Sequence, residues 1–415
     1  MMKKYVLVGA GHRARAMFAK PLATEYGDVA LLSGIYDHNQ VRAQALSKEC
    51  GDIPVFLSFE QMLNQVKPDV VIVAVPDAYH DKYIIGALEA DCDVITEKPM
   101  TIDGVKTEAI LAAEQNSKGS ITVTFNLRFN AYMAKVKELI AGNAVGEILN
   151  IHFEYFLDDV HGADYFRRWH SRMEISGGLL IHKSTHHFDI VNWWLDDEPA
   201  ELYAFGTTRY YGPVREERGK RCLNCHYTQS CEYYWNIRED DFMKAYYLDA
   251  EQEEDGYIRD QCVFGDHINI YDTMSVNVKY DRGALLSYSL IAHSPYEGWK
   301  AVINGTKGRL ELAEYYSGEQ AKENERPIIL YKRSREKIIY MVPKVSGAHG
   351  GADTQLREFL FRSIITDPQL DQQAGSRAGA ISLLMGEAAN KAISQNTPVQ
   401  ISLKTAVKKD APRSL

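Results

Sequence analysis

Residues 5–14 read Tyr-Val-Leu-Val-Gly-Ala-Gly-His-Arg-Ala. Four apolar residues followed by glycine are typical of a strand that is buried on both faces of a parallel sheet, and the glycines then turn the chain into a helix. The spacing Gly9-x-Gly11-x-x-Ala14 provides a tight turn, an approach free of side-chain atoms for a pyrophosphate, and a small residue where helix and strand pack closely. The free N–H groups at the start of that helix would hold the phosphates.

A second strand candidate, residues 31–37, strengthens this prediction, because a glycine turn alone also occurs in proteins that bind no nucleotide. The strand ends in Asp37, about 20 residues past the turn, where a carboxylate can accept from both ribose hydroxyls of a dinucleotide. Asp37 favours NAD over NADP, since a carboxylate repels a 2′-phosphate. His38 and Arg42 keep NADP as an alternative.

Strands and helices alternate from residue 5 to about residue 125, which specifies a doubly wound parallel sheet, that is, a Rossmann fold. The strand candidates are residues 5–9, 31–37, 53–56, 69–75, 94–97 and 121–125. In such a sheet the ligand lies beyond the carboxyl ends of the strands. The predicted cofactor-binding residues at those ends are Gly9, Gly11, His12, Arg13, Asp37, Ala74, Pro76, His80, Glu97, Lys98 and Asn126.

After residue 125 the pattern changes to alternating strands joined by turn residues, with helices between some of them. We therefore predict an α/β chain with a Rossmann domain at 1–125 and a C-terminal α+β domain at 126–415, built on a large, mostly antiparallel open sheet. The irregular, tyrosine-rich stretch 209–262 is too long for an ordinary connection and is predicted to be an insertion. A sheet face without covering helices would be a subunit interface, so we expect a homodimer or homotetramer.

Length and charge exclude several classes of protein. The chain has 415 residues, enough for two full cores, and its net charge of −9 argues against nucleic-acid binding, which needs clustered cations. The first strand begins at about residue 5, which leaves no room for a signal peptide, and no apolar run is long enough to span a bilayer. We expect a cytoplasmic protein with no membrane partner.

Two clusters of polar residues carry candidate chemistry. Lys98 follows a strand directly, so a nearby nicotinamide and partial burial would lower its pKa and let it share the proton of a substrate hydroxyl. The second cluster holds three histidines and one lysine within six residues, a group that is hard to bury without a polar purpose. Its members are His182, Lys183, His186 and His187.

The order and spacing of these motifs resemble the glucose–fructose oxidoreductase, inositol dehydrogenase and MocA family over nearly the whole chain. The motifs are Gly9-x-Gly11-x-x-Ala14, Ala74-Val-Pro76 with His80, Glu97-Lys98-Pro99, Asn126-Leu-Arg128 and Gly177-Gly178 followed by His186-x-x-Asp189. The resemblance implies NAD(P)-dependent oxidation or reduction at a carbon of a sugar, cyclitol or related polyol. It also implies dimers or tetramers formed through the C-terminal sheet.

Within this resemblance, Lys98 matches the motif lysine near the nicotinamide, and His186 matches the acid/base histidine. Family members commonly carry Asp four residues before that histidine, whereas this chain has His182. We predict that His186 takes the hydroxyl proton and that Lys98 stabilises the developing alkoxide. His182 is predicted to be catalytic together with Lys98 and His186, and with Lys183 and His187 it would orient the substrate. A metal held by His182 and His186 is the alternative.

A loop at residues 161–170 combines aromatic, cationic and imidazole groups, which suits contact with a sugar. Arg168 and His170 are its predicted substrate residues. Within the insertion, two closely spaced thiols and two further ones form a candidate structural zinc site, with an iron–sulfur cluster or free thiols as alternatives. Its ligands would be Cys222, Cys225, Cys231 and Cys262.

These features lead to three hypotheses. The first is an NAD(P)-dependent dehydrogenase acting on a sugar, sugar derivative or cyclitol. The second is an NAD-dependent enzyme that cleaves a glycoside by transient oxidation and elimination. The third is a regulatory protein that senses NAD without turnover.

Overall fold

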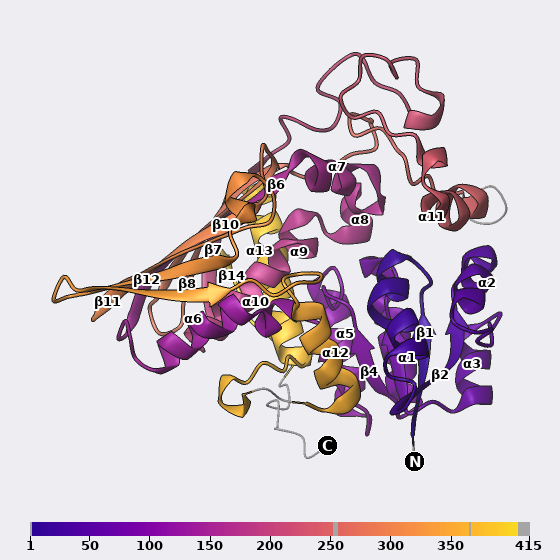
Figure 1. Cartoon of the computed structure of the whole chain (residues 1–415), viewed down its shortest axis with the longest axis horizontal. Helices are drawn as coiled ribbons and strands as arrows, with labels where there is room; N and C mark the ends of the chain where they lie inside the picture. The colour runs from indigo at the N-terminus through magenta and orange to yellow at the C-terminus, as the bar shows by residue number, and fades with distance from the viewer. Residues whose placement is uncertain (1, 252–255, 365–366, 406–415) are drawn as a thin grey trace.

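The structure is a computed structural model that describes residues 2–251, 256–364 and 367–405. It contains a five-stranded sheet near the N-terminus and a nine-stranded sheet formed by the later strands (Figure 1). Residues 1, 365–366 and 406–415 of the predicted domains, and residues 252–255 of the predicted insertion, lie outside the described residues.

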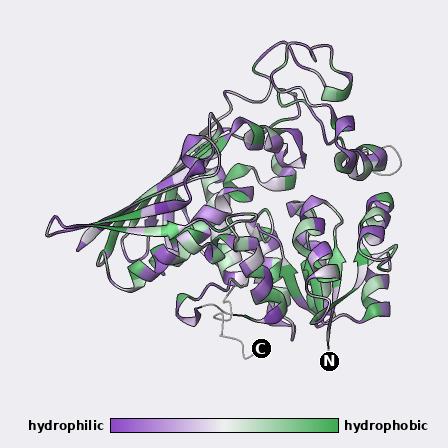
Figure 2. Ribbon diagram, in the orientation of Figure 1, coloured by the Kyte–Doolittle hydropathy of each residue, from purple (hydrophilic) through white to green (hydrophobic). Residues whose placement is uncertain are grey.

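The first sheet is parallel throughout, with the strand order β2-β1-β3-β4-β5. Side chains of β1 alternate between two hydrophobic cores, with Leu7 in one and Val8 in the other, because helices cover both faces. Figure 2 accordingly shows its strands as largely hydrophobic. The strands are β1 (Lys3–Val8), β2 (Ala30–Tyr36), β3 (Val70–Val73), β4 (Asp93–Thr96) and β5 (Ile121–Val123). The expected strand at 53–56 is wrong in extent, since it makes only the bridge between Ile35 and Val55.

The helices of this half begin with a π-helix, η1 (Ala14–Ala19), which continues into α1 (Lys20–Thr24). The others are α2 (Gln40–Glu49), α3 (Phe59–Val66), α4 (His80–Glu89) and α5 (Gly104–Gln115). Side chains at the helix starts hold three of them, because Asn39, Ser58 and Asp103 each accept a backbone N–H of the first turn.

The second sheet has the order β13-β12-β11-β10-β6-β9-β8-β7-β14 and is antiparallel except for the β6–β9 pair. Its strands are β6 (Ile148–Asp158), β7 (Pro199–Thr207), β8 (Thr273–Tyr280), β9 (Leu285–Ser294), β10 (Gly298–Gly305), β11 (Gly308–Tyr315), β12 (Glu325–Lys332), β13 (Lys337–Pro343) and β14 (Val399–Gln400). Helices α6 (Ala131–Ala141), α10 (Ser184–Leu195) and α13 (Ser376–Gln395) pack on one face and share its core. Along β8 buried and exposed residues alternate, so the other face is open.

Late segments return to the first sheet and fasten the two halves together. Helix α12 (Ala352–Arg362) places Leu356 and Phe359 in the core that contains Leu7. The backbone N–H of Val123 in β5 donates to the carbonyl of Ala374 at 2.9 Å. Among the residues that the structure describes, none of the helices combines the length and the apolar character that a membrane span requires.

The insertion leaves the second half after β7 and crosses back to the first. It is mostly loop, with short helices η5 (Cys222–Asn224), η6 (Ile237–Glu239), α11 (Asp241–Met243) and η7 (Lys244–Asp249). In Figure 1 its loops rise above the rest of the molecule, and α11 returns to a position beside α2. There, Arg42 of α2 donates from Nε to the carbonyl of Tyr246 at 3.1 Å.

Candidate active site

The glycine turn after β1 has the shape that a dinucleotide phosphate needs. Gly9 has φ of +102°, and a Cβ there would lie 2.4 Å from the carbonyl oxygen of Ala74, so only glycine fits. At Gly11 a Cβ would meet only the Tyr247 hydroxyl, at 3.6 Å. The next amide, His12 N–H, donates to that hydroxyl at 3.0 Å. The turn therefore presents an amide donor to an oxygen acceptor, as a phosphate site does.

Asp37 lies at the end of β2 and holds the same turn. It accepts the N–H of Ala10 at 2.6 Å and the N–H of Asn39 at 2.8 Å. Burial opposes its ionisation, but His38, Arg42 and the Asn39 amide outweigh burial and lower the pKa of Asp37. An ionised carboxylate at this strand end suits ribose hydroxyls.

Three predicted cofactor residues form one network with Asp353 of α12, in which Arg13 binds both Glu97 and Asp353. Arg13 Nε lies 2.7 Å from Glu97 Oε1, and Arg13 Nη1 lies 2.7 Å from Asp353 Oδ2. Asn126 Nδ2 donates to Asp353 Oδ1 at 2.6 Å. This network joins the ends of β1, β4 and β5 to a helix of the second half, so it braces the edge of the sheet where the cofactor would lie.

His80 is buried beneath the same edge. Its Nδ1 lies 2.9 Å from the carbonyl oxygen of Pro99, and its Nε2 lies 2.8 Å from that of Val75. The ring therefore holds the loops after β3 and β4 side by side. Of the neighbouring predicted residues, Ala74 supports Gly9 and Pro76 precedes the short helix η2 (Asp77–Tyr79).

The structure brings Lys98 together with His182, although the two are 84 residues apart. Lys98 Nζ donates to the carbonyl of His182 at 3.0 Å, and His182 Nδ1 lies 2.6 Å from Asp77 Oδ2. Burial lowers the pKa of Lys98 to about 8, with Lys183 adding to the effect and Asp77 opposing it. Burial also lowers the pKa of His182 and raises that of Asp77. The pair therefore favours neutral forms that share one proton.

Asp77 is not among the residues predicted from the sequence. Its position directly after Pro76, at the carboxyl end of β3, is the signal that points to it. It supplies to His182 the carboxylate that the neighbouring sequence lacks.

His186 lies in the first turn of α10, the helix that follows. His182 and His186 lie on different helices, because α9 (Leu179–His182) ends before Lys183 and α10 starts at Ser184. His186 Nδ1 is buried and has no hydrogen-bond partner among the described residues. Burial, then Lys98 and Lys183, lower the pKa of His186 well below its usual value. The ring is therefore neutral near pH 7 and can accept a proton.

Asp189 lies one turn further along α10 and pairs with Arg128. It accepts a bidentate ion pair from Arg128, at 2.9 Å from Nε and 2.7 Å from Nη2. Both side chains are buried, so this pair fixes α10 against the chain that leaves the Rossmann sheet.

These geometric features agree with comparisons to known proteins. A family model described as "Oxidoreductase family, NAD-binding Rossmann fold" matches residues 3–125, and its partner, "Oxidoreductase family, C-terminal alpha/beta domain", matches residues 137–401. The chain belongs to this oxidoreductase family. It is the glucose–fructose oxidoreductase, inositol dehydrogenase and MocA family, so the chain is an NAD-binding dehydrogenase. The non-catalytic sensor hypothesis is therefore wrong.

YteT of Bacillus subtilis (strain 168) is 38% identical to this oxidoreductase over 419 aligned residues, covering 96% of this chain and 97% of YteT. Two solved structures share the fold. Levoglucosan dehydrogenase in complex with NADH and levoglucosan has a TM-score of 0.70 and 16% identity, with 97% of this chain and 100% of that chain covered. The WlbA dehydrogenase of Bordetella pertussis in complex with NADH and UDP-GlcNAcA has a TM-score of 0.66 and 18% identity, with the same coverage.

Around His182 the oxidoreductase places most of its predicted substrate residues. The ring of His170 packs 4.2 Å from that of His182, and the charge of Arg168 acts on both rings. The ammonium of Lys183 lies 4.7 Å from the centre of the Tyr155 ring. His187 differs, since it is buried in the core behind these residues and lies 2.8 Å from the Tyr288 hydroxyl.

Glu297 is a further acid that the sequence pattern does not single out. It accepts from the Tyr155 hydroxyl at 2.8 Å and lies 3.0 Å from His161 Nδ1. Its contacts with His161, Lys183 and Tyr155 outweigh burial and lower its pKa to about 2. Glu297 is therefore ionised, and it balances the charge of Lys183.

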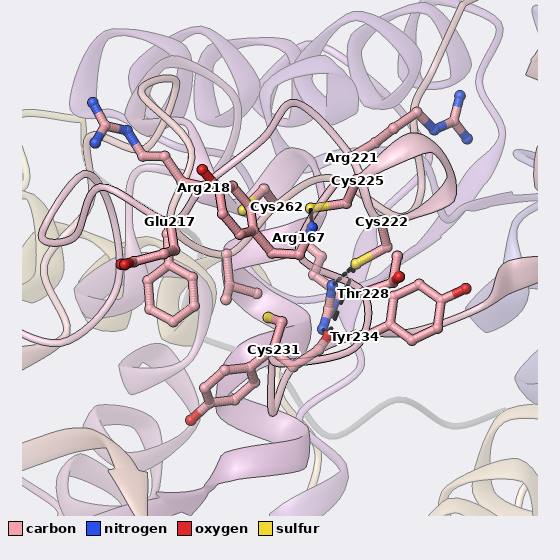
Figure 3. Close-up of a pocket in the computed structure, with 14 residues that line it drawn as sticks. Arg167, Glu217, Arg218, Arg221, Cys222, Cys225, Thr228, Cys231, Tyr234 and Cys262 are labelled. Carbon is pink, nitrogen blue, oxygen red and sulfur yellow. Dashed lines mark hydrogen bonds between the residues drawn. The ribbon is translucent and has the colours of Figure 1, made fainter.

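The thiol cluster of this oxidoreductase does not support the predicted structural zinc or an iron–sulfur cluster. Cys222, Cys225, Cys231 and Cys262 all line one pocket of the insertion (Figure 3). However, the described ranges contain no group of three or more Cys, His, Asp or Glu side chains that could hold a metal ion. His182 and His186 are therefore not part of such a group either. Arg167 Nη1 lies 3.1 Å from the Cys222 sulfur, and Arg215 Nη2 lies 3.2 Å from the Cys231 sulfur. A metal ion bound to these two sulfurs would have to displace the arginine side chains that donate to them.

Proposed function

We propose that this enzyme transfers a hydride between NAD and a hydroxyl-bearing carbon of a sugar, sugar derivative or cyclitol. The observation that carries the proposal is the junction of Lys98, from the cofactor edge of the Rossmann sheet, with His182 and His186, from the second half. When bound, NAD supplies the hydride acceptor. An amine and an unpartnered neutral imidazole near that edge suit a hydroxyl that must lose its proton at the same time.

Each group has a distinct task in the proposed reaction. His186 takes the hydroxyl proton, since its lowered pKa keeps the ring neutral near pH 7. The Lys98 ammonium donates to the oxygen as negative charge develops on it. Asp77 and His182 are positioning residues, because they fix the backbone carbonyl to which Lys98 donates. In the reverse direction the same groups return the proton.

The surroundings support a polyol substrate. Lys183 and His170 offer charged or polar donors, and Trp169 stacks on His170 with ring centres 3.7 Å apart. Polar donors beside aromatic faces are typical of carbohydrate sites. The two solved structures named above are complexes with NADH and UDP-GlcNAcA and with NADH and levoglucosan.

A screen for NADH formation tests the proposal. Purified enzyme is mixed with NAD and, in turn, neutral sugars, glycosides, cyclitols and uronic acids, while near-ultraviolet absorbance and product release are both followed. Steady NADH formation with one class supports net oxidation. Product release without NADH indicates the second hypothesis, a redox-neutral glycoside cleavage. No reaction with any class in either direction would count against both.

Asp77→Asn tests the positioning role. The amide of Asn cannot share a proton with His182 as the carboxyl group of Asp77 does. A buried polar group that loses its partner costs about 1–3 kcal/mol, so kcat should fall by about 5-fold to 100-fold, while KM and NADH affinity change little. Asp81→Asn, on the next turn and paired with Lys106, is the matched control and should keep full activity. A variant of Asp77 that loses only NADH affinity would place the residue in the cofactor site instead.

We also propose that the chain divides into domains at 1–125 and 126–415.

The protein is further proposed to assemble through the open face of the nine-stranded sheet. Large apolar side chains are exposed on that face, including Phe205 at 61% and Leu285 at 50%. Light scattering should give two or four times the chain mass, and Phe205→Glu should lower it. A wild-type monomer at every concentration would contradict the assembly.

A further inference from the structure

The insertion contacts the phosphate-binding turn directly. The hydroxyl of Tyr247 in η7 accepts the N–H of His12 at 3.0 Å. Asn39 Nδ2 donates to the carbonyl of Ala250 at 3.1 Å, which places η7 against the end of β2 as well. The N–H of His12, which the glycine motif would offer to a phosphate oxygen, thus donates to the Tyr247 hydroxyl instead. This is the first sign that the insertion belongs to the cofactor site.

Two arginines behind Tyr247 share a single carboxylate. Arg259 Nη2 lies 2.6 Å from Asp164 Oδ1, and Arg168 Nη1 lies 3.1 Å from Asp164 Oδ2. Arg259 is only 6% exposed. Arg259 Nη1 and Arg168 Nε are buried and have no hydrogen-bond partner in the part of the chain that the structure describes. Buried guanidinium N–H groups without acceptors are costly, so an anion that accepted from both would stabilise this pair.

The two arginines act on the glycine turn. The Arg259 guanidinium lies 5.8 Å from the centre of the Tyr247 ring, whose hydroxyl holds His12. After burial, the charges of Arg168, Arg15 and Arg259, in that order, lower the pKa of His12. The unfilled donors and the turn are therefore within electrostatic reach of each other.

We propose that Arg259 and Arg168 form the second half of the diphosphate site, so that the insertion closes over the bound dinucleotide. On binding, the His12 amide passes from Tyr247 to a phosphate oxygen, and the unpartnered N–H groups of both arginines donate to the diphosphate. The surplus positive charge of two guanidiniums over one carboxylate suits this anion. The proposal rests on the NAD-binding function of the family and is independent of the substrate.

A ligand series tests this inference without catalysis. Wild type, Arg259→Gln and Arg168→Gln are titrated with NADH, and ADP-ribose and adenosine are measured by displacement. Each variant should weaken NADH and ADP-ribose binding by about 10-fold to 100-fold and leave adenosine affinity unchanged. ADP-ribose affinity should also depend less steeply on salt in the variants. Arg259→Lys should retain part of the affinity.

Arg218→Gln is the matched control, because it removes the same charge from the insertion at a residue whose partners are Asp266 and the carbonyl of Arg215. Equal losses for adenosine and ADP-ribose would show that the arginines only support the fold, and would overturn the proposal. Unchanged NADH affinity with a raised KM for an anionic substrate would overturn it too, because the arginines would then hold the substrate. Thermal melting establishes that each variant is folded.

Discussion

Replacing His186 by glutamine is expected to lower kcat by about 10²-fold to 10⁴-fold, the usual contribution of general base catalysis. Glutamine keeps a polar side chain of similar reach but cannot accept the hydroxyl proton. The ring of His186 is neutral near pH 7 because burial and the charges of Lys98 and Lys183 lower its pKa. Single-turnover kinetics with NAD and the substrate found in the screen measure the effect on the chemical step.

NADH affinity should stay the same in His186→Gln, since the groups that contact the glycine turn are Asp37 and Tyr247 and the proposed role of His186 is to take the substrate proton. His226→Gln, at an exposed position in the insertion, is the matched control and should retain wild-type rates. A His186 variant with near-normal kcat would mean that another group takes the proton.

Lys98→Met is expected to lower kcat by about 10²-fold to 10³-fold, the loss typical when a donor to a developing oxyanion is removed. Lys118→Met is the matched control, because the Lys118 side chain is 89% exposed. Lys98→Arg should retain part of the rate, since its guanidinium keeps the charge but changes the geometry of donation.

The pH profile tells a donor from a base at this position. Burial lowers the pKa of Lys98 to about 8, so the ammonium is charged below that pH and becomes neutral above it. If the charged form stabilises the alkoxide, wild-type kcat/KM for oxidation falls above about pH 8. In Lys98→Arg this fall should disappear. Activity that instead rises through this range would make Lys98 the base.

The first sheet could be predicted from the sequence because its strands are short apolar runs that end in glycine, acidic or proline residues. The strand expected at 53–56 failed because Val55 makes a bridge to Ile35 only, and a local pattern cannot show how far pairing extends. Strands β12 and β13 escaped prediction, since Arg326, Pro327 and charged residues hide their alternation at the sheet edge.

The candidate site divides in the same way. Lys98 and His186 can be recognised from their local motifs. Asp77 and Glu297 cannot, because their roles depend on interactions with His182 and Lys183, which lie far away in the sequence. The cysteine spacing predicts a turn but not whether four thiols converge. Arg167 donates to the sulfur of Cys222 but lies 55 residues before it. The cysteine spacing therefore cannot predict this contact.

The most direct test of the central claim is a crystal structure of the enzyme with NADH and the reaction product. We predict that the nicotinamide lies beside Lys98 and that one product oxygen touches both Lys98 Nζ and the His186 ring. A nicotinamide directed away from Lys98, or a product that reaches only one of these two side chains, would contradict the proposed chemistry.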